Sequence, residues 1–186
     1  ESICESYSKG NEAKSMEIGG PRRKLYYNPS NFRAAILTAG GLCPGLNDVI
    51  RALFMELHYR YQVKEVLGIR YGYMGLAPRV GQPPVALTPE MVANIHNNGG
   101  TILGTSRGPQ DLNEMVDFME RERLNALFAI GGDGTQRGAL ALATEIERRN
   151  LDISVIGIPK TIDNDISFVE RSFGFDTAVS IARGVL

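Results

Sequence analysis

Apolar and polar positions follow two different rhythms along this chain from about residue 32 onwards. Short runs place apolar side chains at consecutive positions, and they span residues 34–37, 66–69, 126–130 and 155–158. Consecutive apolar positions are typical of strands that are buried on both faces, as in parallel sheets covered by helices on each side. The pattern therefore predicts four buried parallel strands.

Longer amphipathic stretches separate these runs and predict helices. They lie at about residues 46–58, from residue 89 to about residues 99–100, from residue 111 onwards, and at about residues 136–149. Thr88 and Pro89 suit the N-cap and first position of the second helix. Asp111 and Glu114 suggest a capping box for the third helix. Helical spacing on that helix assigns a core face to Met115, Phe118 and Met119.

Strands that alternate with helices imply right-handed crossovers and a doubly wound, Rossmann-like parallel sheet, so the predicted fold class is α/β. Residues 1–31 mix polar residues and glycine with little periodicity. They predict an extension or arm ahead of one α/β domain over residues 32–186. Residues 181–186 have helical character without a stop signal, so we expect the chain to be the N-terminal part of a larger protein.

Composition narrows the partners and the compartment. The chain carries 20 basic and 21 acidic side chains, a balance that argues against a nucleic-acid partner or a membrane-surface patch. No apolar run approaches the roughly 20 residues that cross a bilayer, so no membrane contact is expected. Cys4 and Cys43 provide no disulfide framework and fit a reducing cytoplasm. Cys43 is expected to fill the core, and His58 and His96 lack ligand-like neighbours, so no zinc site is expected.

Glycines and polar residues gather directly after the first, third and fourth predicted strands, at residues 40–47, 131–135 and 159–165. Ligands of doubly wound proteins bind beyond the carboxyl ends of the strands. Glycine lets the backbone approach a ligand closely, and a following helix directs free N–H groups toward an anion. The first two loops are therefore candidate phosphate cradles, although such turns also occur without a ligand, and Asp133 could be a turn former.

The loop after the fourth strand carries the most specific chemistry. Thr161, Asp163 and Asp165 occupy alternate positions and would project to one side of an extended segment. Neighbouring carboxylates repel, so a cation or a proton-transfer task explains them better than structure alone. Arg107 is either a phosphate clamp or a solvated surface residue, and Tyr73 is assigned to packing rather than to a substrate wall.

Taken together, these loops resemble 6-phosphofructokinase. The resemblance rests on Gly-Gly-x-x-Pro-Gly-Leu-Asn at residues 40–47, Gly-Gly-Thr-Ile-Leu-Gly-Thr-Ser-Arg at 99–107, Gly-Gly-Asp-Gly-Thr at 131–135 and Pro-Lys-Thr-Ile-Asp-Asn-Asp at 159–165. Residues 131–138 are similar to the ATP-dependent enzymes of trypanosomatids and, more distantly, of plants. Gly-Gly-Asp-Gly-Thr also occurs in NAD kinases and lipid kinases, whereas the motif at 159–165 is much more specific.

The resemblance implies transfer of the γ-phosphoryl group of ATP to the 1-hydroxyl of fructose 6-phosphate, with Mg²⁺. It implies a homotetramer in the cytoplasm or, for a trypanosomatid source, in a glycolytic organelle. Asp163 would be the catalytic base, Lys160 would place a positive charge on the transferring group, and Asp133 would hold Mg²⁺. The residues implied for ATP are Gly41, Arg107, Gly108, Gly132, Asp133, Gly134 and Thr135, and those implied for the sugar phosphate are Thr161, Ile162, Asp163 and Asp165.

Two positions bear on the phosphoryl donor. Lys160 stands where the bacterial ATP-dependent enzymes have glycine, and it resembles both the pyrophosphate-dependent and the trypanosomatid enzymes. Gly134 stands where pyrophosphate-dependent enzymes usually carry an aspartate, which would repel the α-phosphate of a nucleotide, so Gly134 favours ATP. A pyrophosphate-dependent enzyme is the first alternative. A non-catalytic nucleotide-binding module is the second, because the family's second half, with most of its sugar-phosphate-binding arginines, is not in this chain; an NAD or lipid kinase is the third.

Overall fold

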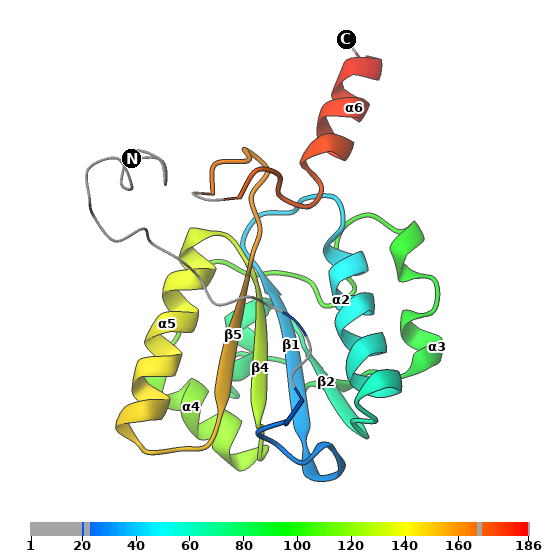
Figure 1. Cartoon of the computed structure of the whole chain (residues 1–186). Coiled ribbons are helices and arrows are strands. Elements are labelled where there is room, and N and C mark those ends of the chain that lie inside the picture. Colours follow the sequence, from blue (N-terminus) through cyan, green and yellow to red (C-terminus); the bar gives the residue numbers. More distant parts are fainter. Residues whose placement is uncertain (1–19, 21–22, 167–168, 186) are drawn as a thin grey trace, which may run out of the picture.

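A computed structural model describes residue 20, residues 23–166 and residues 169–185 of the chain (Figure 1). The sheet has five strands in the order β3-β2-β1-β4-β5. Its parallel strands coincide with the predicted ones, and they are β1 (Arg33–Ala39), β2 (Glu65–Ile69), β4 (Ala126–Gly131) and β5 (Ser154–Pro159). The strand β3 (Val85–Ala86) pairs antiparallel with β2, so the expectation of a wholly parallel sheet is wrong at this edge. Two residues are too short to produce an apolar pattern.

Helices cover both faces of the sheet, as a doubly wound fold requires. Figure 1 shows α4 (Leu112–Arg121) and α5 (Asp133–Arg148) on one face, and α2 (Leu46–Met55) and α3 (Pro89–Val92) on the other. Alternate residues of β1 serve the two cores. Ala35 and Leu37 pack in the core that contains α4 and α5, whereas Ala34 and Ile36 pack in the core that contains α2. The α/β prediction is confirmed, and consecutive apolar positions reflect burial on both sides of the sheet.

The predicted helices differ from the observed ones mainly at their ends. α2 continues as a π-helical turn, η2 (Glu56–Arg60), beyond the predicted end at residue 58. The Thr88 hydroxyl accepts a hydrogen bond from the Met91 N–H as predicted, but α3 ends after Val92 and a 3₁₀ turn, η4 (Ile95–Asn97), follows. The Arg51 guanidinium donates a hydrogen bond to the Ala93 carbonyl at 3.2 Å. A continuing helix would use this carbonyl to accept one of its own backbone N–H groups. α5 begins at Asp133 rather than near residue 136, so the third glycine loop is the first turn of this helix.

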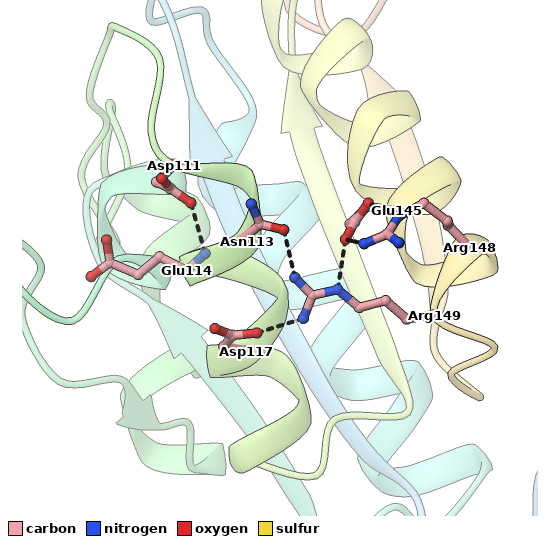
Figure 2. Close-up of polar contacts among 7 residues, drawn as sticks. All are labelled: Asp111, Asn113, Glu114, Asp117, Glu145, Arg148 and Arg149. Atoms are coloured by element: carbon pink, nitrogen blue, oxygen red, sulfur yellow. Dashed lines mark hydrogen bonds and ion pairs between the residues drawn. The ribbon is translucent and has the colours of Figure 1, made fainter.

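Half of the predicted capping box forms at α4. The Asp111 carboxylate accepts a hydrogen bond from the Glu114 N–H at 3.0 Å (Figure 2). The Glu114 carboxylate does not return this bond to the Asp111 backbone, because it forms an ion pair with Arg79 at 2.9 Å. Behind this cap, the predicted core face is confirmed, since Met115, Phe118 and Met119 are all buried.

The remaining packing predictions fall partly inside the described residues. Cys43 is buried among apolar side chains, which confirms that it fills the core, and this burial raises the pKa of its thiol. The His58 ring stacks on Phe54 with centroids 5.1 Å apart, a packing contact. Cys4 and most of the predicted arm, residues 1–19 and 21–22, lie outside the described residues, so the arm stays a prediction. No helix within the described ranges is long and apolar enough to cross a membrane.

The strand register brings three loops to one edge of the sheet. Ala39 at the end of β1 is paired with Gly131 at the end of β4, and Gly131 is paired with Pro159 at the end of β5. The glycine-rich and charged loops that follow these strands therefore start side by side. α6 (Phe175–Val185) rises beyond this edge, away from the sheet, and buries none of its residues (Figure 1).

Candidate active site

A cavity of about 620 Å³ opens at this edge, beside the ends of β1 and β4. The strand order reverses between these two strands, which is where doubly wound proteins bind their ligands. Every residue that the sequence suggested for ATP lines the cavity, together with Lys160: these are Gly41, Arg107, Gly108, Gly132, Asp133, Gly134 and Thr135. Four segments that are far apart in the sequence thus contribute to one concave surface.

Hydrogen bonds between two loops bring Arg107 to the cavity. Gly40, with a φ of 83° that favours glycine, donates its N–H to the Ser106 carbonyl at 3.3 Å. The Thr105 hydroxyl donates to the Gly40 carbonyl at 2.8 Å. A Cβ atom placed on Gly41 would lie 3.8 Å from Arg107 Nη2 and 3.7 Å from Lys160 Nζ. Two cationic groups therefore converge above the first glycine loop, which favours the clamp over the surface interpretation of Arg107.

Lys160 makes this part of the cavity an anion site. Its side chain is only 9% exposed. Among the described residues, neither Lys160 nor Arg107 has a carboxylate within ion-pair distance. Both cations line the cavity without a counter-charge, so the site is suited to a ligand that brings negative charge.

The N-terminus of α5 adds neutral donors to the same site. Gly132 is the N-cap and provides no side-chain cap, so the N–H groups of the first turn have no intrahelical partner and no capping oxygen. Such groups, with the positive end of the helix dipole, bind phosphates. The Tyr73 hydroxyl, in η3 (Gly72–Leu76), donates to the Thr135 carbonyl at 2.6 Å and holds this turn in place. Burial raises the pKa of Tyr73, which keeps the phenol protonated as a donor.

Protein packing explains the glycine at position 131 of this turn but not the glycine at position 134. A Cβ atom on Gly131 would lie 2.6 Å from the Ala39 carbonyl oxygen, so the packing of β1 against β4 requires glycine there. A Cβ atom on Gly134 would meet nothing within 4 Å, although Gly134 lines the cavity. No protein contact explains Gly134, and the space beside it is open to a ligand.

The apolar residues that form one wall of the cavity were not predicted from the sequence. Leu112 and Met115 of α4, Ala141 of α5 and Tyr73 line the same cavity as Lys160. Tyr73 also packs against Gly138, whose Cβ would lie 2.7 Å from the ring, and against the core of α4 and α5, so the assignment to packing is confirmed for a residue that lines the cavity as well. Nothing in the sequence indicates this wall, because α4 lies beside the phosphate loops only through packing on α5.

The loop after β5 is bent, so the condition under which its three polar side chains would project to one side is not met. The chain bends at residues 162–163, and Asn164 adopts a left-handed φ of 54°. The buried Thr161 hydroxyl donates to the Asp165 carboxylate and accepts from the Asp163 N–H at 3.1 Å. Asn164 accepts from the Ser172 N–H at 2.7 Å, which braces the loop. Thr161, Ile162, Asp163 and Asp165 do not line the cavity but follow Lys160 directly, with Asp163 and Ile162 exposed.

One carboxylate is available to a metal ion inside the cavity. Asp133, at the first position of α5, is exposed there. The described residues contain no group of three or more His, Cys, Asp or Glu side chains that could hold a metal. Mg²⁺ that accompanies a nucleotide is held by one or two carboxylates and the phosphates rather than by a protein cage. A single aspartate beside an anion site fits that arrangement.

Comparison with known proteins decides the family. Residues 33–186 match the phosphofructokinase family. The chain belongs to the phosphofructokinase family. This membership removes the NAD-kinase and lipid-kinase alternatives, which rested on residues 131–135 alone.

Phosphofructokinases of known name and structure agree with this assignment. The chain is 50% identical over 183 residues to the ATP-dependent 6-phosphofructokinase of Borreliella burgdorferi, which covers 97% of this chain and 41% of that protein. It is 54% identical over 166 residues to the enzyme of the same name from Trypanosoma brucei brucei, covering 89% of this chain and 34% of that protein. The chain thus spans less than half the length of these relatives.

Solved phosphofructokinase structures share the fold. A pyrophosphate-dependent phosphofructokinase from Marinobacter aquaeolei superposes with a TM-score of 0.72 at 21% identity, covering 82% of this chain and 40% of that one. Pichia pastoris phosphofructokinase in the T-state superposes with a TM-score of 0.71 at 25% identity, covering 90% of this chain and 20% of that one. The predicted phosphofructokinase-like architecture is therefore confirmed.

Proposed function

We propose that this chain is the nucleotide-binding part of a 6-phosphofructokinase that transfers the γ-phosphoryl group of ATP to the 1-hydroxyl of D-fructose 6-phosphate. The observation that carries the proposal is the composition of the cavity. The first group of lining residues offers Lys160, Arg107 and the free N–H groups of α5, and the second group provides apolar side chains from Tyr73, α4 and α5. Phosphates suit the first group and a nucleobase suits the second, whereas pyrophosphate would leave the apolar wall without a ligand group.

Gly134 supports ATP over pyrophosphate. The space beside its Cα is empty, and it lies on the cavity surface at the phosphate-binding turn. A nucleotide needs room there for its α-phosphate. The relatives at 50% and 54% identity carry the name ATP-dependent, which agrees with this choice.

The proposed reaction assigns a proton and a charge to specific residues. Asp163 accepts the proton of the sugar 1-hydroxyl as its oxygen attacks the γ-phosphorus, and the bond to the β,γ-bridging oxygen breaks to release ADP. Lys160, Arg107 and the α5 amides offset the negative charge of the phosphates, which is the main protein contribution in such transfers. Asp133 would hold Mg²⁺ together with the donor phosphates, and this ion supplies further charge neutralisation when bound.

The loop after β5 is the proposed acceptor side of the site. Thr161, Ile162 and Asp165 would shape the site of fructose 6-phosphate around Asp163. The hydrogen bonds from Thr161 to Asp165 and from the Asp163 N–H to Thr161 make this loop a defined shape that could receive a sugar. Homotetrameric assembly and the cytoplasmic location, or a glycolytic organelle in a trypanosomatid, remain parts of the proposal.

A coupled assay on the full-length protein tests the function. Fructose 6-phosphate is offered with Mg²⁺ and either ATP or pyrophosphate, and fructose 1,6-bisphosphate is measured. We expect turnover with ATP and little with pyrophosphate. Turnover with pyrophosphate but not with ATP would contradict the proposal that ATP is the donor. Absence of product with either donor would contradict the proposed enzyme function and favour a nucleotide-binding module.

A further inference from the structure

We propose that Gln136 is a positioning residue that sets the spacing between the phosphate-binding turn of α5 and the loop that carries Asp163. The inference rests on the proposed function, because it concerns the alignment of donor and acceptor. Gln136 is not part of the cavity lining and would touch neither substrate. Its role is exerted through the two strand ends on which those loops are mounted.

The side-chain amide of Gln136 connects β4 to β5. Its Nε2 donates to the Gly131 carbonyl at 2.9 Å and to the Ile158 carbonyl at 3.2 Å. A primary amide has two N–H groups and can therefore satisfy both carbonyls at once. Gly131 is the last residue of β4, and its carbonyl also accepts the Lys160 N–H at 3.0 Å. The amide thus reinforces the last bridge between the two strands.

The fold is shaped around this contact. A Cβ atom on Gly157 would overlap the amide oxygen of Gln136, so β5 needs a glycine where this side chain crosses it. Gly157 and Gln136 are complementary in shape, whereas a solvated glutamine would place no demand on the facing strand. The contact is therefore a specific one between α5 and β5.

This contact lies between the two halves of the proposed chemistry. Gly132, Asp133, Gly134 and Thr135 precede Gln136 directly on the donor side, whereas Lys160 follows Ile158 by two residues and Asp163 by five. β5 is the edge strand of the sheet in this chain and pairs with β4 alone, so the Gln136 amide adds a side-chain contact to the one ladder that holds its end. Loss of the amide would let the segment that carries Lys160 and Asp163 shift, whereas the N–H groups in the first turn of α5 would keep their place. Misplacement of reacting groups by about 1 Å can lower turnover on the order of 100-fold.

The test compares two substitutions with a control in the full-length protein. Gln136→Met keeps the length and removes both donors, and Gln136→Glu places an acceptor-only carboxylate against two carbonyl oxygens. We expect kcat to fall about 10- to 100-fold in Gln136→Met, and further in Gln136→Glu, with a smaller change in the KM for ATP, because Lys160 is the one donor-side group on the shifted segment. Gln82→Met is the control, because Gln82 accepts a hydrogen bond from Arg70 at 2.9 Å and lies outside the cavity. The kinetics of this variant should match those of the unchanged protein.

Hydrogen exchange provides a readout that does not depend on activity. In Gln136→Met the amides of residues 158–165 should exchange faster than in the unchanged protein, whereas those of residues 126–130 should not. Unaltered exchange would overturn the proposal whatever the kinetics show, as would a parallel loss of kcat, ATP affinity and melting temperature, which would indicate a general structural role. If the unchanged protein is inactive with both donors but exchange responds as expected, the proposed function fails and the positioning contact stands.

Discussion

Lys160 and Gly134 show how single residues define the donor site. Lys160 lines the cavity close to Arg107 and Gly41 and has no carboxylate partner among the described residues. The space beside Gly134, in the first turn of α5, is empty, and no contact with another protein atom requires glycine there. Both features are unfavourable or unexplained in the protein alone and become favourable with a polyphosphate bound.

The first prediction concerns Gly134. In Gly134→Asp, the new carboxylate would enter the open space at the phosphate-binding turn and repel the α-phosphate of ATP. We expect kcat/KM for ATP to fall on the order of 10- to 100-fold, equivalent to roughly 1.4–2.7 kcal/mol, and any pyrophosphate-dependent activity to change much less. Gly134→Asn is the control for size without charge. Equal loss with both donors would contradict the argument for ATP.

The second prediction concerns the proposed base. Asp163→Asn should lower kcat by about 10²- to 10⁴-fold because a general base is lost. The KM for ATP should change little, since Asp163 does not line the nucleotide cavity. Asp176→Asn serves as the matched control, because Asp176 is an exposed carboxylate that pairs with Arg171. Near-normal turnover of Asp163→Asn in steady-state assays would remove Asp163 from the mechanism.

At the scale of the element, the first turn of α4 combines a helix cap with residues that line the cavity. Asp111 caps this helix through the Glu114 N–H, and Leu112 and Met115 in its first turn form part of the apolar wall. The partner expected from the capping box instead binds Arg79, in the segment that follows η3. The cap therefore fixes the start of α4, and the ion pair attaches it to a neighbouring segment.

The third prediction tests this cap. Asp111→Ala should lower the free energy of unfolding by about 1 kcal/mol, because one backbone N–H loses its acceptor. A modest rise in the KM for ATP should accompany it, since the first turn of α4 bears the apolar wall. Urea unfolding and steady-state kinetics measure the two effects. Asp111→Asn should behave like the unchanged protein, because asparagine caps helices as well as aspartate does; a loss as large as that of alanine would contradict the capping role.

At the scale of the whole molecule, an ionic network joins the two helices that border the cavity. Figure 2 shows Arg149, at the end of α5, reaching Asp117 and Asn113 of α4 while it also binds Glu145. Glu145 is only 8% exposed. Hydrogen bonds from Arg148 and Arg149 lower the pKa of its carboxyl group from 4.5 to about 2. The network connects α4 to α5, the two helices that contribute Leu112, Met115 and Ala141 to the apolar wall.

The fourth prediction follows from the direction of that shift. Because the pKa of Glu145 is lower in the folded protein than in the unfolded chain, its stabilising contribution is complete above about pH 4.5 and is lost as the pH falls toward 2. Glu145→Gln should therefore be less stable than the unchanged protein at pH 7, and the difference should shrink below pH 4.5. Thermal unfolding between pH 7 and pH 3 measures this. A difference that is constant with pH would show that the Glu145 charge contributes no stability.

Local signals in the sequence were sufficient for the elements and for the chemistry of the loops. Continuous apolar runs predicted the four parallel strands, because a strand covered by helices on both faces has no polar side. Thr88 and Asp111 were recognised as N-caps, because a cap involves only the residues of one helical turn. The proximity of the two glycine loops was also predictable, since parallel strands bring the loops after β1 and β4 to one edge of the sheet.

Contacts between distant segments decided the rest. Arg51 of α2 binds the Ala93 carbonyl just beyond the end of α3, and Glu114 pairs with Arg79 rather than with its own helix. The apolar wall combines residues of α4 and α5. The bend at residues 162–163 is held by Thr161 and by Ser172, which no spacing rule connects to it. Hydrogen bonds and packing within one turn are encoded by adjacent residues. Those between segments exist only after the chain has folded, because the choice among possible partners depends on which elements the cores bring together.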